Sequence, residues 1–472
     1  MQKRARKAAA CRGEFRLDFR PSWVFTVFHP VRNQARRAVW CVVLAPILLA
    51  VLPARAEGLP PSVPGIDAPE LARLGSYAVG VRTIALVERD QPDLLAIDPV
   101  SGSVPKHDRK LTVDLWYPAS PAPGSPRETY SGSLPSEPPA APATFTVPGI
   151  AVRDAPPAGG GYPLVVVSHG YSNATAAMSW LTENLASKGY VVAAIRHDDP
   201  PITDTSKFPQ VVLRRPLDIA YVTGVLQESL GAEHLIDPSK TALVGYSIGG
   251  YGVLTAAGAT LEPTGRLAMM VPGKLLTPYV RGARESKAIA VKALKAVVAI
   301  SPAGGGALGA CGADGLKDIR APVLLIAGNQ DRTVDYTTGA RAIFDGVSHS
   351  TRYLLTLKEA GHAIGLNGVP EAMRQRLWDQ DWFEDPVWRK ERINAINAHF
   401  ITAFLDRYVK GDASRTAYLD VRTSESDEGV WPAESSLPYG AFSPSDSNIT
   451  VWKGFQRNHA AGMQLLMAAP QP

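Results

Sequence analysis

The feature that most constrains the fold of this chain is a strand-turn-helix pattern around Ser247. A short apolar run from Thr241 to Val244 predicts a buried strand, and a G-x-S-x-G pentapeptide at 245–249 follows it directly. The small residues that come next predict a helix. A tight turn between a strand and a helix pushes a serine hydroxyl out of the fold, and flanking glycines let the two elements approach closely. We therefore predict that Ser247 is a nucleophile. The alternative is an ordinary glycine-rich junction.

Two backbone N–H groups are predicted to bind the negative charge that develops on a substrate oxygen. Ile248 begins the predicted helix, where backbone donors lack intrahelical partners and the helix dipole favours an anion. A second apolar run, from Pro163 to Val167, leads through His169 to Tyr171, and the second donor is expected at such a strand end. We assign that role to the N–H of Tyr171. We predict that His169 anchors this loop through hydrogen bonds.

Two further strand ends supply a base and a carboxylate. One apolar run leads into Asp331 and another leads into His362. Imidazole can take the serine proton near neutral pH, and a carboxylate fixes the histidine tautomer. Asp335 is the competing carboxylate, and a capping aspartate and a loop histidine are the alternatives for the two residues taken singly. Because all three groups follow predicted strands in the order Ser, Asp, His, we predict a catalytic triad of Ser247, Asp331 and His362.

The apolar runs also predict the fold class. Residues 77–87 and 111–117 alternate in polarity and predict antiparallel strands at the start of a sheet. The buried runs that follow alternate with helical patterns, which predicts an α/β fold with a mostly parallel central sheet of about eight strands, flanked by helices. These later runs lie at 163–167, 189–196, 241–244, 296–301, 321–327 and 352–357.

We divide the chain into a leader, residues 1–56, and one domain, residues 57–472. Within the domain, the proline- and glycine-rich stretch 120–161 predicts an extended loop. Residues 259–295 form a predicted helical insertion after the nucleophile helix, and the tail 412–472 has no predicted place in the fold. The insertion carries several leucines and a methionine pair, which adapt to irregular apolar partners. It therefore forms either a wall or lid for an acyl chain, or an excursion pinned to the core.

The leader contains a predicted secretory signal peptide at residues 31–56. Arginines precede an apolar run at 38–52, and Ala54 and Ala56 supply the two small residues of a cleavage site. The run is shorter than the roughly 20 residues of a membrane-spanning helix. We therefore expect a periplasmic or secreted protein with no stable membrane span after cleavage. A retained membrane anchor is the alternative.

The charge balance argues against a nucleic-acid partner. The chain has a net charge of +5, but the leader alone holds 11 Lys+Arg against 2 Asp+Glu, which leaves 38 basic and 42 acidic side chains in the rest. Cys311 is the only cysteine after the leader, so the domain has no internal disulfide. A metal site at His197, Asp198 and Asp199 is an alternative reading, but no remote ligand cluster completes it. We predict neither a metal nor a cofactor.

Six motifs carry a family resemblance: LWYPA (115–119), SHGYSN (168–173), RPLDIAYV (215–222), GYSIGG (245–250), GNQD (328–331) and EAGH (359–362). They resemble bacterial α/β-hydrolases of the platelet-activating-factor acetylhydrolase-like group, often described as predicted dienelactone hydrolases. The resemblance runs from about Tyr77 to Lys410 and implies a carboxylic-ester hydrolase that acts on small-molecule esters through an acyl-enzyme. The chain departs from true dienelactone hydrolases in having serine where they have cysteine. Its His-Gly-Tyr loop is similar to that of secreted cutinase-like polyesterases.

The resemblance implies short- to medium-chain acyl esters or phospholipid-like acetyl esters as substrates. Two other classes of function stay open at this point. A peptidase or an acyltransferase can use the same triad, although the sequence shows no repeat of the kind that forms a propeller. A non-catalytic binding protein can keep the fold without the chemistry, although the serine, the aspartate and the histidine are all intact.

Overall fold

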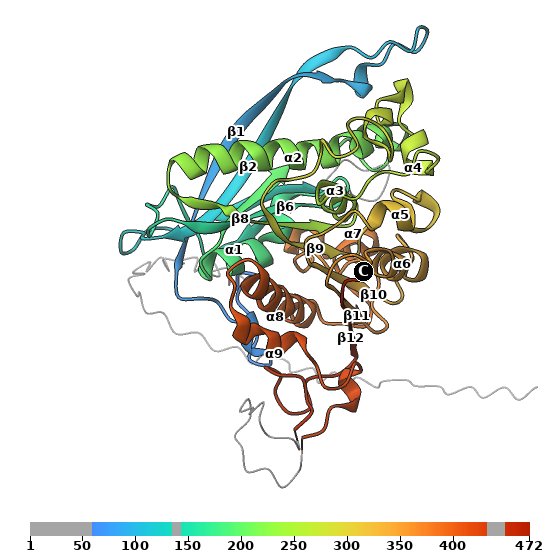
Figure 1. Ribbon diagram of the computed structural model, residues 1–472. Coiled ribbons are helices and arrows are strands. Elements are labelled where there is room, and N and C mark those ends of the chain that lie inside the picture. Colours follow the sequence, from blue (N-terminus) through green and yellow to red (C-terminus); the bar gives the residue numbers. More distant parts are fainter. Residues whose placement is uncertain (1–58, 135–142, 432–448) are drawn as a thin grey trace, which may run out of the picture. The chain divides into compact units, whose positions relative to one another are not determined.

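A single ten-stranded sheet organises the part of the chain that the structure describes (Figure 1). The structure is a computed structural model, and it describes residues 59–134, 143–431 and 449–472. The predicted signal peptide therefore lies outside the described residues. No helix within the described ranges is both long enough and apolar enough to cross a membrane.

Six neighbouring strands run parallel through the centre of the sheet. In spatial order they are β7 (Val191–Arg196), β6 (Tyr162–Ser168), β8 (Ile236–Tyr246), β9 (Leu294–Ile300), β10 (Val323–Gly328) and β11 (Arg352–Leu357). Two long antiparallel strands, β2 (Lys106–Ala119) and β1 (Ala78–Pro92), continue the sheet beyond β7. These eight strands are the ones that the apolar runs predict, and together they form the mostly parallel sheet of an α/β-hydrolase fold.

Two additional strands lie at the edges of the sheet. The two-residue β5 (Val152–Arg153) pairs with β1, and β12 (Met463–Ala468) pairs antiparallel with β11. β12 belongs to the tail that the sequence left without a place. Its side chains alternate, with Met463 and Leu465 buried. This part of the tail therefore forms an edge strand of the sheet.

The prediction of one extended loop at 120–161 is wrong. The segment contains an antiparallel hairpin of β3 (Thr129–Leu134) and β4 (Ala143–Pro148), as well as β5. Nine of its ten prolines lie outside the two strands and the tenth is the last residue of β4, while the strands themselves largely alternate small polar residues with large apolar ones. Tyr130 and Phe145 are buried, and the Phe145 ring lies 6.2 Å from that of Phe383. Burial of these aromatic rings outweighs the overall loop-like composition.

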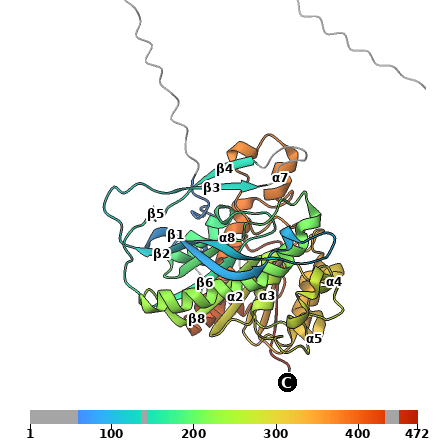
Figure 2. The same ribbon diagram turned by 90° about the horizontal axis from the view of Figure 1, so that it is seen from above.

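Helices cover both faces of the sheet, and each face has its own apolar core (Figures 1 and 2). α1 (Ser179–Ser187) and α8 (Lys390–Tyr408) pack on one face, while α2 (Phe208–Ala232) and α3 (Ile248–Ala256) pack on the other. α2 has Pro209 in its first turn, where proline is tolerated because the N–H that it lacks would have no intrahelical partner. The shorter helices are α4 (Arg266–Met269), α5 (Gly312–Leu316), α6 (Ala342–Gly346), α7 (Leu377–Phe383) and α9 (Thr416–Leu419).

The insertion at 259–295 contains little regular helix. α4 has only four residues, and short 3₁₀ turns at Pro272–Lys274 and Thr277–Tyr279 follow it. Leu267 and Leu276 are buried in the core on the α2–α3 face, whereas Met269 is 68% exposed. Most of the apolar content of the insertion therefore pins it to the domain, and its contribution to an acyl-binding wall stays a prediction.

Candidate active site

Ser247 occupies a strained turn between β8 and α3. Its backbone has φ 54° and ψ −119°, a conformation that is uncommon for a residue with a side chain. The turn is held by Ser247 N–H, which donates to the Ile300 carbonyl at 2.9 Å, and by Gly250 and Ala303, whose N–H groups donate to the Ser247 carbonyl. At Gly249 a Cβ would lie 2.1 Å from the Ser168 carbonyl oxygen, so only glycine lets α3 start this close to β6.

The structure brings Ser247, His362 and Asp331 together at the carboxyl edge of the sheet. His362 Nε2 lies 3.0 Å from Ser247 Oγ, and His362 Nδ1 lies 2.7 Å from Asp331 Oδ2. Asp331 follows β10 and His362 follows β11, and parallel neighbours present their following loops on the same edge. Asp335, the competing carboxylate, instead accepts hydrogen bonds from the backbone and hydroxyl of Thr338.

Asp331 is held as a carboxylate by its surroundings. Burial by itself raises the pKa of this group, but the hydrogen bond to His362 and backbone donors outweigh burial and bring the pKa below its ordinary value. Its Oδ1 accepts from the N–H groups of Thr333 and Val334 at 2.9 and 3.1 Å. An ionised Asp331 accepts a hydrogen bond from His362 Nδ1–H, which keeps that proton on Nδ1 and leaves Nε2 free to take a proton from Ser247.

Sequence reasoning missed the residues that hold the histidine loop. Asp385 accepts the Gly361 N–H at 2.7 Å, and the Lys390 ammonium donates to the Ala363 carbonyl. The Tyr246 hydroxyl donates to the His362 carbonyl at 3.2 Å. Only Tyr246 carries a signal in the sequence, because it lies inside the nucleophile pentapeptide.

The two predicted oxyanion donors are available. Ile248 is the first residue of α3, and Tyr171 follows the end of β6. Neither backbone N–H donates to an acceptor in the ranges that the structure describes. Ser247 and His362 are partly exposed, so the edge of the sheet that carries them is open to solvent.

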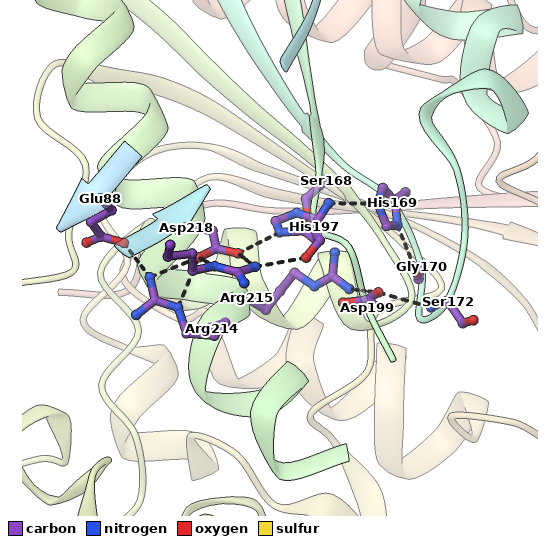
Figure 3. A network of polar contacts seen from close by, with 11 residues as sticks. Glu88, Ser168, His169, Gly170, Ser172, His197, Asp199, Arg214, Arg215 and Asp218 are labelled. Atoms are coloured by element: carbon purple, nitrogen blue, oxygen red, sulfur yellow. Dashed lines mark hydrogen bonds and ion pairs between the residues drawn. The ribbon is translucent and has the colours of Figure 1, made fainter. Parts of the chain in front are cut away.

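A second Ser-His-Asp arrangement lies inside the protein (Figure 3). Ser168 Oγ is 2.9 Å from His197 Nε2, and His197 Nδ1 is 3.1 Å from Asp218 Oδ2. The relative exposures of Ser168, His197 and Asp218 are 0%, 2% and 0%, so no substrate reaches this serine. Burial lowers the pKa of His197 to about 3, with the Arg215 charge acting in the same direction, which makes it a weak base. This arrangement fixes the ends of β6 and β7 to α2.

Asp218 pairs with two arginines in this buried network, and Glu88 supplies a second carboxylate to one of them, Arg214. Arg109 donates to its two carboxylate oxygens at 2.8 and 2.6 Å, and Arg214 donates to Oδ1 at 3.0 Å. His197 belongs to this network while Asp198 is exposed, so the residues at 197–199 do not converge. Across the described ranges, no group of three or more His, Cys, Asp or Glu side chains is arranged to hold a metal ion.

The family model that matches this chain covers the region that carries Ser247, Ile248 and Tyr171. The model of the family described as PETase, PET hydrolase-like, matches residues 152–273, which is less than half of the chain. A cutinase, est1 of Thermobifida alba, is 32% identical over 96 residues, covering 20% of this chain and 30% of the relative. Cutinase 2 of Thermobifida cellulosilytica is 33% identical over 96 residues, which cover 20% of this chain and 34% of that relative.

The chain thus spans about a third of the length of the curated relatives that it matches. Among solved structures, a ferulic acid esterase from Streptomyces cinnamoneus superposes with a TM-score of 0.47 at 21% identity, covering 71% of this chain and 91% of that one. The similarities are to PET hydrolase-like and cutinase proteins. They do not single out the platelet-activating-factor acetylhydrolase-like group that the motifs resemble.

Proposed function

We propose that this protein is a serine hydrolase that cleaves carboxylic esters through an acyl-enzyme. The observation that carries the proposal is the hydrogen-bonded chain from Ser247 through His362 to Asp331, placed on a strained turn at a solvent-accessible edge of the sheet. A serine hydroxyl alone is a weak nucleophile, and such a chain activates it. Similarity over 96 residues to a protein named a cutinase adds support for ester substrates.

In the first half of the proposed reaction, His362 takes the Ser247 proton as Oγ attacks the ester carbonyl. Asp331 stabilises the imidazolium that forms, and the N–H groups of Ile248 and Tyr171 bind the oxygen that becomes negative. The tetrahedral species then collapses. Its bond to the alcohol oxygen breaks, the imidazolium protonates that oxygen, and the acyl group stays on Ser247.

In the second half, water replaces the alcohol. His362 takes a proton from the water as its oxygen attacks the acyl carbonyl, and the same two N–H groups bind the second oxyanion. Breakage of the bond to Ser247 Oγ releases the carboxylic acid and returns the proton to the serine. Both halves pass through an oxyanion, so both depend on the two donors.

We propose short- to medium-chain acyl esters as the substrate class, with phospholipid-like acetyl esters as a narrower possibility drawn from the motif resemblance. We also propose that the predicted signal at 31–56 exports the protein, so that it meets these substrates in the periplasm or outside the cell. The insertion at 259–295 is proposed to limit the length of acyl chain accepted. Hydrolysis of p-nitrophenyl esters of graded length, together with an acetylated phospholipid analogue, separates these substrates.

The test of the chemistry uses a fluorophosphonate probe that labels activated serines. Wild type is expected to be labelled and to hydrolyse p-nitrophenyl esters, while Ser247→Ala loses the label and about a millionfold in kcat. Ser168→Ala is the matched control, because it changes the serine of the buried arrangement and should still be labelled. Labelling of folded Ser247→Ala, or its near-normal turnover, would refute the assignment.

A further inference from the structure

A hydrogen bond to the Gly170 carbonyl fixes the peptide that carries the Tyr171 N–H. Gly170 C=O and Tyr171 N–H share one planar, trans peptide and point in opposite directions. His169 Nδ1 lies 2.7 Å from the Gly170 oxygen, and the backbone N–H of His197 points at His169 Nε2 at 3.3 Å (Figure 3). Since Nε2 accepts, the His169 proton is on Nδ1 and is donated to Gly170. This bond sets the direction of the Tyr171 N–H.

The histidine is kept in the form that this bond needs. Burial lowers the pKa of His169 to about 4, and the positive charge of Arg215 acts in the same direction. At neutral pH His169 is therefore uncharged, so Nε2 can accept while Nδ1–H donates. A donor on the Gly170 carbonyl also polarises the peptide and strengthens its N–H as a donor.

The next peptide of the loop is held by an ion pair. Asp199 Oδ2 accepts the Ser172 N–H at 3.0 Å, and the same oxygen accepts from Arg215 Nη2 at 2.5 Å. Ser172 itself has φ 51°, a left-handed conformation that needs support in a residue with a side chain. With the peptides on both sides of Tyr171 Cα fixed, neither backbone dihedral of Tyr171 is free to move.

Arg215 connects this support to the nucleophile helix. Its side chain is fully buried in α2, and a Cβ at Gly252 of α3 would lie 2.6 Å from Arg215 Cγ, so the two helices meet at this side chain. Its Nε and Nη1 atoms find no hydrogen-bond partner in the described residues. A buried ion pair with incompletely satisfied donors contributes little to stability, because desolvation offsets the attraction. We therefore ask which part of the backbone this ion pair holds in position.

We propose that Asp199 and Arg215, together with His169, are positioning residues that aim the Tyr171 N–H at the developing oxyanion. The proposal rests on the proposed ester hydrolysis and assigns no contact with substrate to these side chains. It connects the oxyanion loop after β6 to α2 and α3, so that the donor and Ser247 are fixed to the same pair of helices.

Two double variants isolate the hydrogen bond to Ser172. Asp199→Asn/Arg215→Met removes both charges but keeps an acceptor oxygen, whereas Asp199→Leu/Arg215→Met removes the acceptor with a side chain of similar size. Replacing both members of a buried ion pair avoids leaving one charge unpaired, so both variants are expected to fold. Asp198→Asn is a further control, since this neighbour is exposed. Thermal unfolding establishes that each variant is folded.

Kinetics with p-nitrophenyl acetate then test the inference. The leucine variant is expected to lose about 10- to 100-fold in kcat relative to the asparagine variant, somewhat less than removal of a whole oxyanion donor costs. KM and the acidic limb of the pH profile should not change, because His362 is untouched. An alkylboronic acid, which forms a tetrahedral adduct on Ser247, should bind more weakly by a similar factor. Equal kcat in the two variants, or a loss confined to KM, overturns the inference.

Failure of the inference is distinguishable from failure of the proposed function. If wild type neither reacts with the fluorophosphonate nor cleaves esters, the proposed function fails; if wild type is active and the two variants are equal, only the positioning role fails. Should the double variants not fold, His169→Asn against His169→Leu makes the same comparison on the Gly170 side. The asparagine amide can replace Nδ1–H as a donor and leucine cannot, so equal turnover in this pair also overturns the inference.

Discussion

Mild acid is expected to destabilise this protein through histidines that are buried in uncharged form. Three of them have a strongly lowered pKa, which is about 4 for His169, about 3 for His197 and about 3 for His399. Burial is the main cause in each case. Nearby positive charge adds to it, from Arg215 for the first two and from Lys188 for His399.

The sign follows from proton binding in the two states. The unfolded chain binds a proton at each of these histidines near pH 6.5, while the folded protein does so only at about pH 4 or below. Their stabilisation is therefore fully present above pH 6.5 and is lost as the pH falls toward the folded pKa. At pH 5 each histidine costs about 2 kcal/mol, or about 6 kcal/mol for all three. A typical domain has about 5–15 kcal/mol in total.

Two buried carboxyl groups reduce this loss. Burial raises the pKa of Glu88 and of Glu183, so the folded protein holds protons there that the unfolded chain has released. These groups stabilise the folded state as the pH falls toward 4.5, in opposition to the histidines. Lys188 acts in the same direction as the histidines, because burial lowers its pKa to about 7, so a net loss of several kcal/mol is expected between pH 7.5 and pH 5.

Urea unfolding followed by tryptophan fluorescence at pH 7.5, 6.5, 5.5 and 5.0 measures this slope. His399 lies among Phe400, Tyr418 and Phe455, so His399→Gln removes one titrating group without touching the proposed catalytic residues. The slope of its unfolding free energy should be shallower by about 1 kcal/mol per pH unit. His234→Asn, at an exposed position with φ 58°, is the matched control and should leave the slope unchanged. Equal slopes in wild type and His399→Gln would refute the reasoning.

Three further predictions concern the proposed catalytic carboxylate, the turn at Ser247 and the leader. Asp331→Asn should lower kcat by about ten-thousandfold while Asp335→Asn has little effect, and the reverse result in esterase assays would move the acid to Asp335. Gly249→Ala should abolish activity or folding, because its Cβ would lie 2.1 Å from a backbone oxygen, whereas Gly224→Ala, with open space around it in α2, should raise the thermal midpoint slightly. N-terminal sequencing of the native protein should find a start near Glu57, and a protein that retains residue 40 contradicts signal cleavage.

Local patterns in the sequence were sufficient to predict the central sheet. A parallel strand buried on both faces is a continuous apolar run, and the loops after neighbouring strands meet at one edge. This is why Ser247, Asp331 and His362 could be placed together although up to 115 residues separate them. The β3–β4 hairpin and β12 were missed because their stability comes from burial of a few side chains against distant elements.

The supporting contacts could not be predicted, because they depend on exact side-chain placement across the fold. Asp385 and Lys390 hold the histidine loop from a segment after α7, and the sequence around them carries no motif. In the sequence, Asp199 stood out only as a member of a possible metal-binding triplet, and Arg215 only as part of the motif at 215–222. Their pairing is a consequence of how α2 packs beneath the loop that follows β7.

The buried Ser168–His197–Asp218 arrangement bears on how catalytic sites are identified from side-chain geometry. The hydrogen-bond distances of a Ser-His-Asp chain occur twice in this protein, and one of the two arrangements is enclosed in the core. The side chain of His362 is 19% exposed and that of His197 is 1% exposed. Solvent accessibility therefore distinguishes the two arrangements, whereas their hydrogen-bond distances do not. A geometric template therefore needs a test of solvent access beside it. The interior copy offers a natural negative example for calibrating that test.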